Sequence, residues 1–196
     1  MNLTEMRARV REDLQDEDAA NYRWTDDEVD GAIERAVGEF SFRYPRQQQD
    51  DIATVDDSSE IDISSLSKLL KVYSVEFPIG QKPPYYQHFH VWEATIHMED
   101  SGNGEDARIR WGKLHTLDAA STTIPEQFDE IIVLGATGYL ATSASVYTVD
   151  RATIAGRHAT INFGKWGRER LARCERELKS IALANRIVTK ELYLDK

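Results

Sequence analysis

The sequence predicts a mainly helical α+β fold, in which a small antiparallel β-sheet is inserted in the middle of a helical bundle. Two observations predict this class. Near both ends of the chain, apolar residues recur at spacings of three and four, which is the period of an amphipathic helix. Between these segments, short runs alternate apolar and polar residues, as half-buried strands do. With 196 residues, of which 41% are hydrophobic, the chain is long enough to bury a core of its own.

Two helices joined by a short turn are expected over residues 3–16 and 25–43. Thr4 is the expected N-cap of the first helix, and a capping box begins the second, because Thr25 is followed three residues later by Glu28. One face of the first helix is apolar, and it comprises Leu3, Met6, Val10 and Leu14. The pattern therefore predicts an antiparallel helical hairpin at the start of the chain.

The β insertion is expected over residues 50–118. Its strands are rich in aromatic and β-branched residues, and they are separated by segments containing Gly, Pro, Asn and Asp. The segment EDSGNGED, residues 99–106, contains the Gly and Asn of a hairpin turn lengthened into a loop. We therefore expect a single sheet of three to five strands, with a hairpin at 99–106.

Helices are expected again over residues 125–147 and 165–186, the first of them beginning at Pro125. Residues 131–149 carry no charge, but the Thr, Ser and Gly residues among them argue against a membrane span. Glycine lowers the stability of a helix by about 1 kcal/mol relative to alanine, so glycines inside a helix suggest a close contact that a larger side chain would block. The small residues are therefore predicted to let this helix pack closely against its neighbours, and those singled out are Gly135, Gly138, Ala141 and Ser145.

Charge is distributed unevenly along this expected single domain (1–186) and C-terminal arm (187–196). Residues 1–60 contain 17 Asp or Glu and 7 Arg, whereas residues 151–196 contain 11 Lys or Arg and 5 acids. An acidic body disfavours general affinity for nucleic acids, which depends on clustered Lys and Arg. Two interpretations of the basic end stay open: a solvated face, or a segment that docks on an acidic surface of another subunit or protein.

Residues capable of catalysis do not form a recognisable pattern. His88 and His90 could share a metal from one face of a strand, but no third ligand follows at a suitable spacing, so packed or exposed histidines are the favoured interpretation. Cys174 lies on the apolar face of the last helix, where a thiol usually serves as a small core residue. Because no catalytic, metal-binding or phosphate-binding pattern is recognisable, a protein that is not an enzyme and needs no cofactor is expected. A cytosolic location is expected because neither a secretory signal nor a disulfide framework is visible.

Three segments together resemble one family, the head-tail connector or adaptor (head-completion) proteins of tailed bacteriophages. They are the acidic hairpin with its RWTDDEV helix start (3–41), the small-residue helix after a Pro-Glu start (124–146) and the charged last helix (165–187). They cover a little under half of the chain, and the resemblance lies in their order and spacing. The longer insertion at 50–118 is similar to that of adaptors from short-tailed phages.

The resemblance implies a structural virion protein of the neck, assembled in the host cytoplasm. Such proteins form a ring of about twelve subunits below the portal, contact a stopper, nozzle or tail protein, and let DNA pass through the lumen without specific binding. From the residues themselves, no membrane span, metal or cofactor is expected. In this family the C-terminal segment reaches the portal, so the portal-docking candidates are Leu192, Tyr193 and Leu194.

Two other functions are weighed against the connector. One is a nucleic-acid binder that would use the basic last helix, with Arg168, Arg170, Arg173 and Arg176 on phosphates. Glutamates interleaved with these arginines weaken it, because they would lie beside the same phosphates. The other is a cell-wall-degrading neck protein, which lacks paired acids in a recognisable setting.

Overall fold

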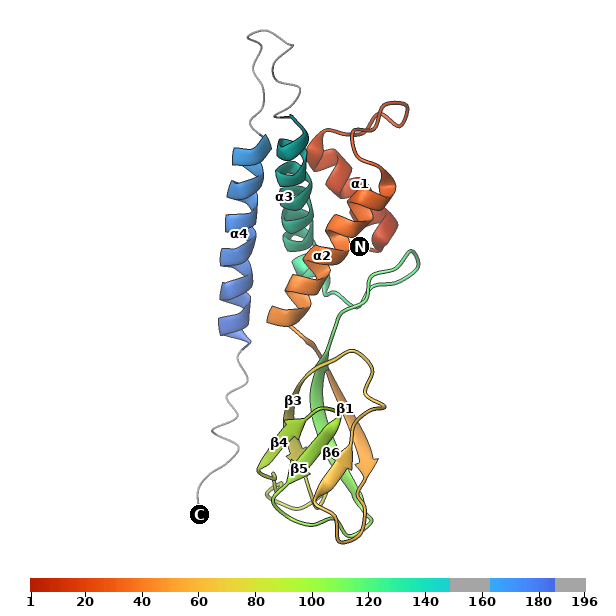
Figure 1. The fold of residues 1–196 in the computed structure, drawn as a ribbon, viewed down its shortest axis with the longest axis vertical. Helices are drawn as coiled ribbons and strands as arrows, with labels where there is room; N and C mark the ends of the chain where they lie inside the picture. The colour runs from red at the N-terminus through yellow and green to blue at the C-terminus, as the bar shows by residue number, and fades with distance from the viewer. Residues whose placement is uncertain (149–162, 186–196) are drawn as a thin grey trace. The chain divides into compact units, whose positions relative to one another are not determined.

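The structure, a computed structural model, describes residues 1–148 and 163–185, and this part of the chain has an α+β fold (Figure 1). It forms two compact units, a helical unit (Met1–Tyr44 with His115–Ala184) and a β unit (Pro45–Leu114). The elements of the helical unit are α1 (Leu3–Leu14), α2 (Asp26–Arg43), the 3₁₀ turn η1 (Glu126–Phe128), α3 (Asp129–Thr148) and α4 (Phe163–Ala184). Those of the β unit are β1 (Arg46–Ala53), β2 (Glu60–Asp62), β3 (Leu69–Glu76), β4 (Phe89–Trp92), β5 (Thr95–Met98) and β6 (Asp106–Lys113).

Each unit has its own hydrophobic core, and this is why the chain divides. One core joins the four helices, and the other lies entirely within the β unit. The sequence analysis treated residues 1–186 as one domain with an insertion at 50–118, whereas the inserted unit is Pro45–Leu114. The last residues of the expected insertion return to the helical unit, where His115 is buried and its ring hydrogen-bonds the carbonyl of Tyr44 at 3.0 Å.

Both helices of the hairpin begin with a capping box. At α2, the predicted pair is confirmed: the Glu28 amide donates to Thr25 Oγ1 and the Thr25 amide donates to Glu28. At α1, the prediction of Thr4 is wrong, because Asn2 is the N-cap and exchanges hydrogen bonds of 2.9 and 3.0 Å with Glu5. Asn2 has a Glu three residues later, as a capping box requires, and Thr4 does not.

The third and fourth helices differ slightly in their bounds from the expected 125–147 and 165–186. Pro125 caps the 3₁₀ turn η1, and α3 follows from Asp129. The segment from Gly135 to Gly138 lies inside α3. Among the helices that the structure describes, none is long and apolar enough to cross a membrane.

The β unit contains two sheets where one was predicted. Both are antiparallel and three-stranded, with strand orders β1-β6-β3 and β2-β5-β4. The predicted hairpin at 99–106 is wrong, since β5 and β6 belong to different sheets. Gly102 shows the reason: its amide donates to the Ser58 carbonyl and its carbonyl accepts from Asp57, so this loop pairs with the 54–58 turn. A Cβ at position 102 would lie 2.6 Å from the Val55 carbonyl oxygen, so the contact requires glycine.

Candidate interaction surfaces

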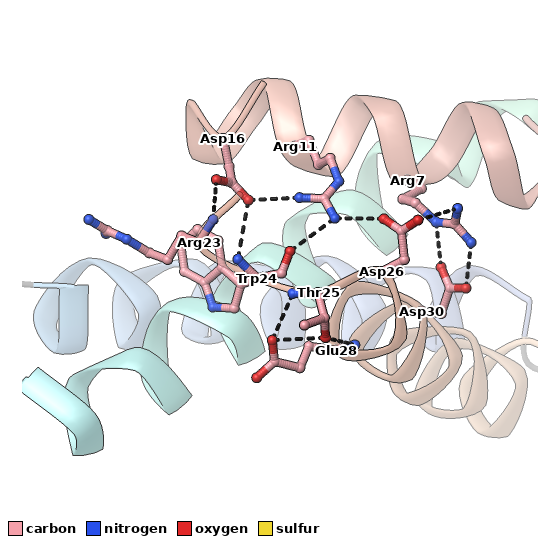
Figure 2. A network of polar contacts seen from close by, with 9 residues as sticks. All are labelled: Arg7, Arg11, Asp16, Arg23, Trp24, Thr25, Asp26, Glu28 and Asp30. Carbon is pink, nitrogen blue, oxygen red and sulfur yellow. Dashed lines mark hydrogen bonds and ion pairs between the residues drawn. The ribbon is translucent and has the colours of Figure 1, made fainter. Parts of the chain in front are cut away.

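A buried arginine holds the α1–α2 hairpin together (Figure 2). Arg11 is 5% exposed, and its guanidinium donates to Asp16 and Asp26 at 2.7 Å each and to the Trp24 carbonyl at 3.0 Å. The ring of Tyr22 lies against the same guanidinium, 3.6 Å from its carbon to the ring centroid. A buried charge is tolerated only when it is paired and hydrogen-bonded. Arg11, which belongs to α1, meets this condition with contacts to Asp16 and Trp24 in the loop and to Asp26 in α2.

The same network extends along the hairpin in both directions (Figure 2). Arg7 makes two hydrogen bonds to Asp30, of 2.6 and 2.8 Å, and a longer one to Asp26. On the loop side, Asp16 accepts from the backbone amide of Arg23 at 2.7 Å. The bond from Arg11 lowers the pKa of the Asp26 carboxyl, and the bond to Asp30 raises the pKa of Arg7. Both shifts mean that the folded hairpin favours the charged forms.

Glycines bring α3 and α4 into direct contact. A Cβ at Gly138 would lie 2.8 Å from the Cγ atom of Leu171. One at Gly167 would lie 2.7 Å from Thr142 Oγ1 and 3.0 Å from the Gly138 carbonyl oxygen. One at Gly135 would lie 3.3 Å from Cys174 Sγ in α4 and 3.1 Å from the Cβ atom of Ala36 in α2. We refer to Gly135, Gly138 and Gly167 as the glycine seam.

The seam includes two of the four small residues singled out in the sequence. Ala141 is fully buried in the same unit, and the side chain of Ser145 lies outside the described residues. Gly167 was not singled out, although α4 carries Gly164 only three residues before it, so a search for small residues in both helices could have found it. The contacts of the glycine seam therefore join helices within one chain.

A groove of about 580 Å³ lies between α2 and α4, with α3 beneath it. Cys174 lies on the buried side and is 6% exposed, which confirms that it faces the core, and burial raises the pKa of its thiol to about 11. Burial also raises the pKa of Tyr139, as does its hydrogen bond with Glu39. At the rim, Phe42 is 69% exposed. The groove is lined by Glu39, Phe42, Arg43, Tyr139, Leu171, Ala172, Cys174, Glu175 and Leu178.

Phe42 is a surface residue that the sequence analysis missed. It belongs to α2 but lies outside the apolar stripe of that helix, which passes through Val37 and Phe40. A large aromatic side chain on the polar side of an amphipathic helix is a signal that could have revealed it.

Several cationic side chains of the basic helix α4 form ion pairs or hydrogen bonds with other residues of the same chain. Arg170 donates to Thr137 Oγ1 at 2.8 Å and forms an ion pair with Asp13. Arg173 pairs with Glu177 one turn away. Two of the four arginines proposed as phosphate contacts are thus already engaged. Within the described part of the chain, Arg168 and Arg176 are exposed and have no ion-pair partner.

His90 packs against His97, whereas His88 is the residue considered with it as a possible metal ligand. His90 lies directly opposite His97 on the neighbouring strand, and their rings stack with centroids 4.7 Å apart. The sequence analysis grouped His90 with His88, which lies before β4, because spacing along one strand does not reveal the partner across a sheet. His97 Nδ1 also lies 3.4 Å from a Glu60 carboxylate oxygen. In the ranges 1–148 and 163–185, no group of three or more His, Cys, Asp or Glu residues could hold a metal.

The three portal-docking candidates, Leu192, Tyr193 and Leu194, lie outside the described residues. Neither the known protein-family models nor the curated proteins match this sequence. Assignment of a function therefore depends on the order of its elements and the chemistry of its surfaces.

Proposed function

We propose that this chain is the subunit of a head-tail connector of a tailed bacteriophage. About twelve copies form a ring below the portal, join the head to a stopper, nozzle or tail protein, and continue the DNA channel for genome retention and ejection. The observation that carries the proposal is the order of elements: an acidic capped hairpin, an inserted β unit, a small-residue helix and a charged last helix. This order is the one on which the family resemblance depends.

The charges of the chain support the proposal that the protein surrounds DNA without binding it. Residues 1–44 contain 12 Asp or Glu and 6 Arg, and the exposed acids of this segment include Glu5, Glu12, Glu17 and Asp18. Like-charge repulsion keeps phosphates from adhering to such a surface, which suits a channel through which a duplex must slide. On the basic helix, internal contacts of Arg170 and Arg173 leave few cations for phosphate binding.

Negative-stain microscopy of the full chain mixed with the portal ring of the same virus tests the proposal. We expect a second ring stacked coaxially on the portal. Absence of stacking by the full chain would contradict the proposal. The docking assignment is tested separately, by deletion of residues 187–196 and by replacing Leu192, Tyr193 and Leu194 together with alanine, either of which should abolish stacking. Replacement of Lys190 and Lys196 with alanine is the control, and it should leave stacking unchanged.

A filter-binding assay distinguishes the connector from a nucleic-acid binder. The connector should retain little duplex DNA even at low salt, because its acidic surface repels phosphates. Tight binding that falls steeply as salt rises, and that is lost in an Arg168→Glu, Arg176→Glu variant, would favour the nucleic-acid function instead.

A further inference from the structure

One face of α2 is exposed and carries an acidic and apolar pattern. Asp27 and Glu34 are exposed acids, and neither has an ion-pair partner among the described residues. Phe42, two turns beyond Glu34, is 69% exposed. Between these residues lie Gly31 and Gly38, around which a Cβ would meet nothing within 4 Å. We refer to Asp27, Gly31, Glu34, Gly38 and Phe42 as the α2 face.

One face of α4 carries the opposite charge with the same kind of apolar end. Arg168 and Arg176 are its exposed cations without ion-pair partners in the described ranges. Leu183, near the C-terminal end of the helix, is 73% exposed. We refer to Arg168, Arg176 and Leu183 as the α4 face. Exposed large apolar side chains at the ends of two charged helix faces are unusual on a surface that contacts only water.

The two faces match in spacing as well as in charge. Phe42 lies eight residues after Glu34 and fifteen after Asp27, and Leu183 lies seven after Arg176 and fifteen after Arg168. At about 1.5 Å per residue, the outer charges lie about 22 Å from the apolar residue on both helices, and the inner charges lie about 10–12 Å from it. Within the helical unit, the C-terminal ends of α2 and α4 both point toward the bottom of Figure 1. In this view α4 runs nearly vertically and α2 runs obliquely, so a rotation that relates neighbouring copies can bring α2 of one copy alongside α4 of the next with the same general direction.

We propose that the α2 face of one copy packs in parallel against the α4 face of a second copy. Phe42 then lies beside the partner's Leu183, Glu34 beside the partner's Arg176, and Asp27 beside the partner's Arg168. Because the two faces belong to different helices, the contact is heterologous, and repeating it generates a ring when the rotation closes. This inference rests on the proposed function, for which it names the subunit interface.

The glycines and the charges both favour a second copy as the occupant. Gly31 and Gly38 lower the stability of α2 relative to alanine and make no close contact within the chain, but they leave room for another helix to approach. The acids of the α2 face exclude a phosphate backbone as its partner. Opposite charges on the α4 face provide the complementarity that selects one orientation.

Thiol cross-linking tests the interface directly. The probe is the Glu34→Cys, Arg176→Cys double variant of the full chain, treated with a short bis-maleimide at high protein concentration and low ionic strength, and again on the portal ring. We expect a ladder of dimers, trimers and higher species, because each copy contributes one thiol to each of two contacts. An equimolar mixture of the two single variants should stop at dimers, and neither single variant alone should cross-link. Each sample is compared with the unsubstituted chain, in which Cys174 is buried.

Charge exchange provides the matched control. Glu34→Arg should abolish self-association, and Arg176→Glu added to it should restore association. Glu17→Arg replaces another exposed acid, in the α1–α2 loop, and should have no effect. Lack of a ladder under both conditions, or dimers from Glu34→Cys alone, would overturn the proposal. Coaxial rings without a ladder would leave the connector function standing and remove this interface, whereas a ladder without portal binding would do the reverse.

Discussion

The α1–α2 pair and the α3–α4 pair are held together by different physics within one helical unit. Between α1 and α2, Arg11 and Arg7 bridge to carboxylates on the loop and on the opposite helix. Between α3 and α4, Gly138 and Gly167 bring the backbones so close that a methyl group would collide with Leu171 or Thr142. The first contact depends on charge and the second on volume, so each should be sensitive to perturbations that the other tolerates.

The largest expected effect is at the centre of the charged contact. Arg11→Met leaves Asp16, which is 7% exposed, without its cation, so we expect a loss of about 3–5 kcal/mol in the free energy of unfolding. Urea denaturation followed by far-ultraviolet circular dichroism measures it. Arg173→Met is the control, because its pair with Glu177 is exposed and should contribute about 0.5 kcal/mol or less. Equal losses in the two variants would show that burial of Arg11 is unimportant.

The volume-dependent contact should break with an added apolar side chain. Gly138→Leu places its Cβ 2.8 Å from Leu171, so we expect a loss of about 3 kcal/mol or an unfolded subunit that does not assemble. For stability alone, the matched control is Gly38→Leu, also in the middle of a helix, where no atom of the same chain lies within 4 Å. Assembly of this control is not compared, because Gly38 belongs to the α2 face. The same denaturation experiment should find the control at least as stable as the wild type. A stable, assembling Gly138→Leu variant would disprove close packing at this position.

A single methyl group should change stability with opposite signs at two helical glycines. Gly167→Ala would place its Cβ 2.9 Å from the Thr142 backbone nitrogen, which cannot rotate away, so a loss of about 1–3 kcal/mol is expected. Gly31→Ala meets no atom within 4 Å and should gain about 1 kcal/mol from helix propensity. Melting temperatures by calorimetry should therefore move in opposite directions. A gain at both positions would mean that α3 and α4 separate more readily than their contact suggests.

The smallest expected effect distinguishes the two contacts by pH. Folding lowers the pKa of Asp26, so its contribution to stability is fully present above the ordinary carboxyl pKa of about 4 and is lost as pH falls through the lowered value. Between about pH 6 and about pH 3, the urea midpoint of the wild type should decrease more than that of Asp26→Asn. Gly167→Ala should keep the pH dependence of the wild type, because the seam contains no carboxylate. An identical pH dependence in Asp26→Asn would remove Asp26 from this account.

Much of the helical unit could be predicted from sequence because its signals are local. The capping box at Thr25 and Glu28 joins residues three apart, and the apolar stripes recur every three or four residues. Where the prediction of a cap was wrong, at Thr4, a second capping sequence lay two residues earlier. By contrast, alternation within β5 and β6 indicates strands but does not reveal that they belong to different sheets.

The candidate surfaces were predicted less completely, because their contacts join residues that are far apart in the sequence. Gly135 and Gly138 were singled out from their helix, but their contacts with Ala36 and Leu171 join elements far apart in the chain. Phe42 was missed because its exposure depends on where the rest of the helical unit packs.

The sequence by itself determined that four helices form and approximately where they lie, which of their faces are apolar and how acidic the first part of the chain is. These properties depend on residue type and on neighbours within about one helical turn. Only the tertiary structure decided that Arg11 is buried between two helices, that Gly167 meets Gly138, and that the β strands form two sheets. Each of these contacts joins residues that are distant in sequence, and whether they meet depends on how the whole chain packs.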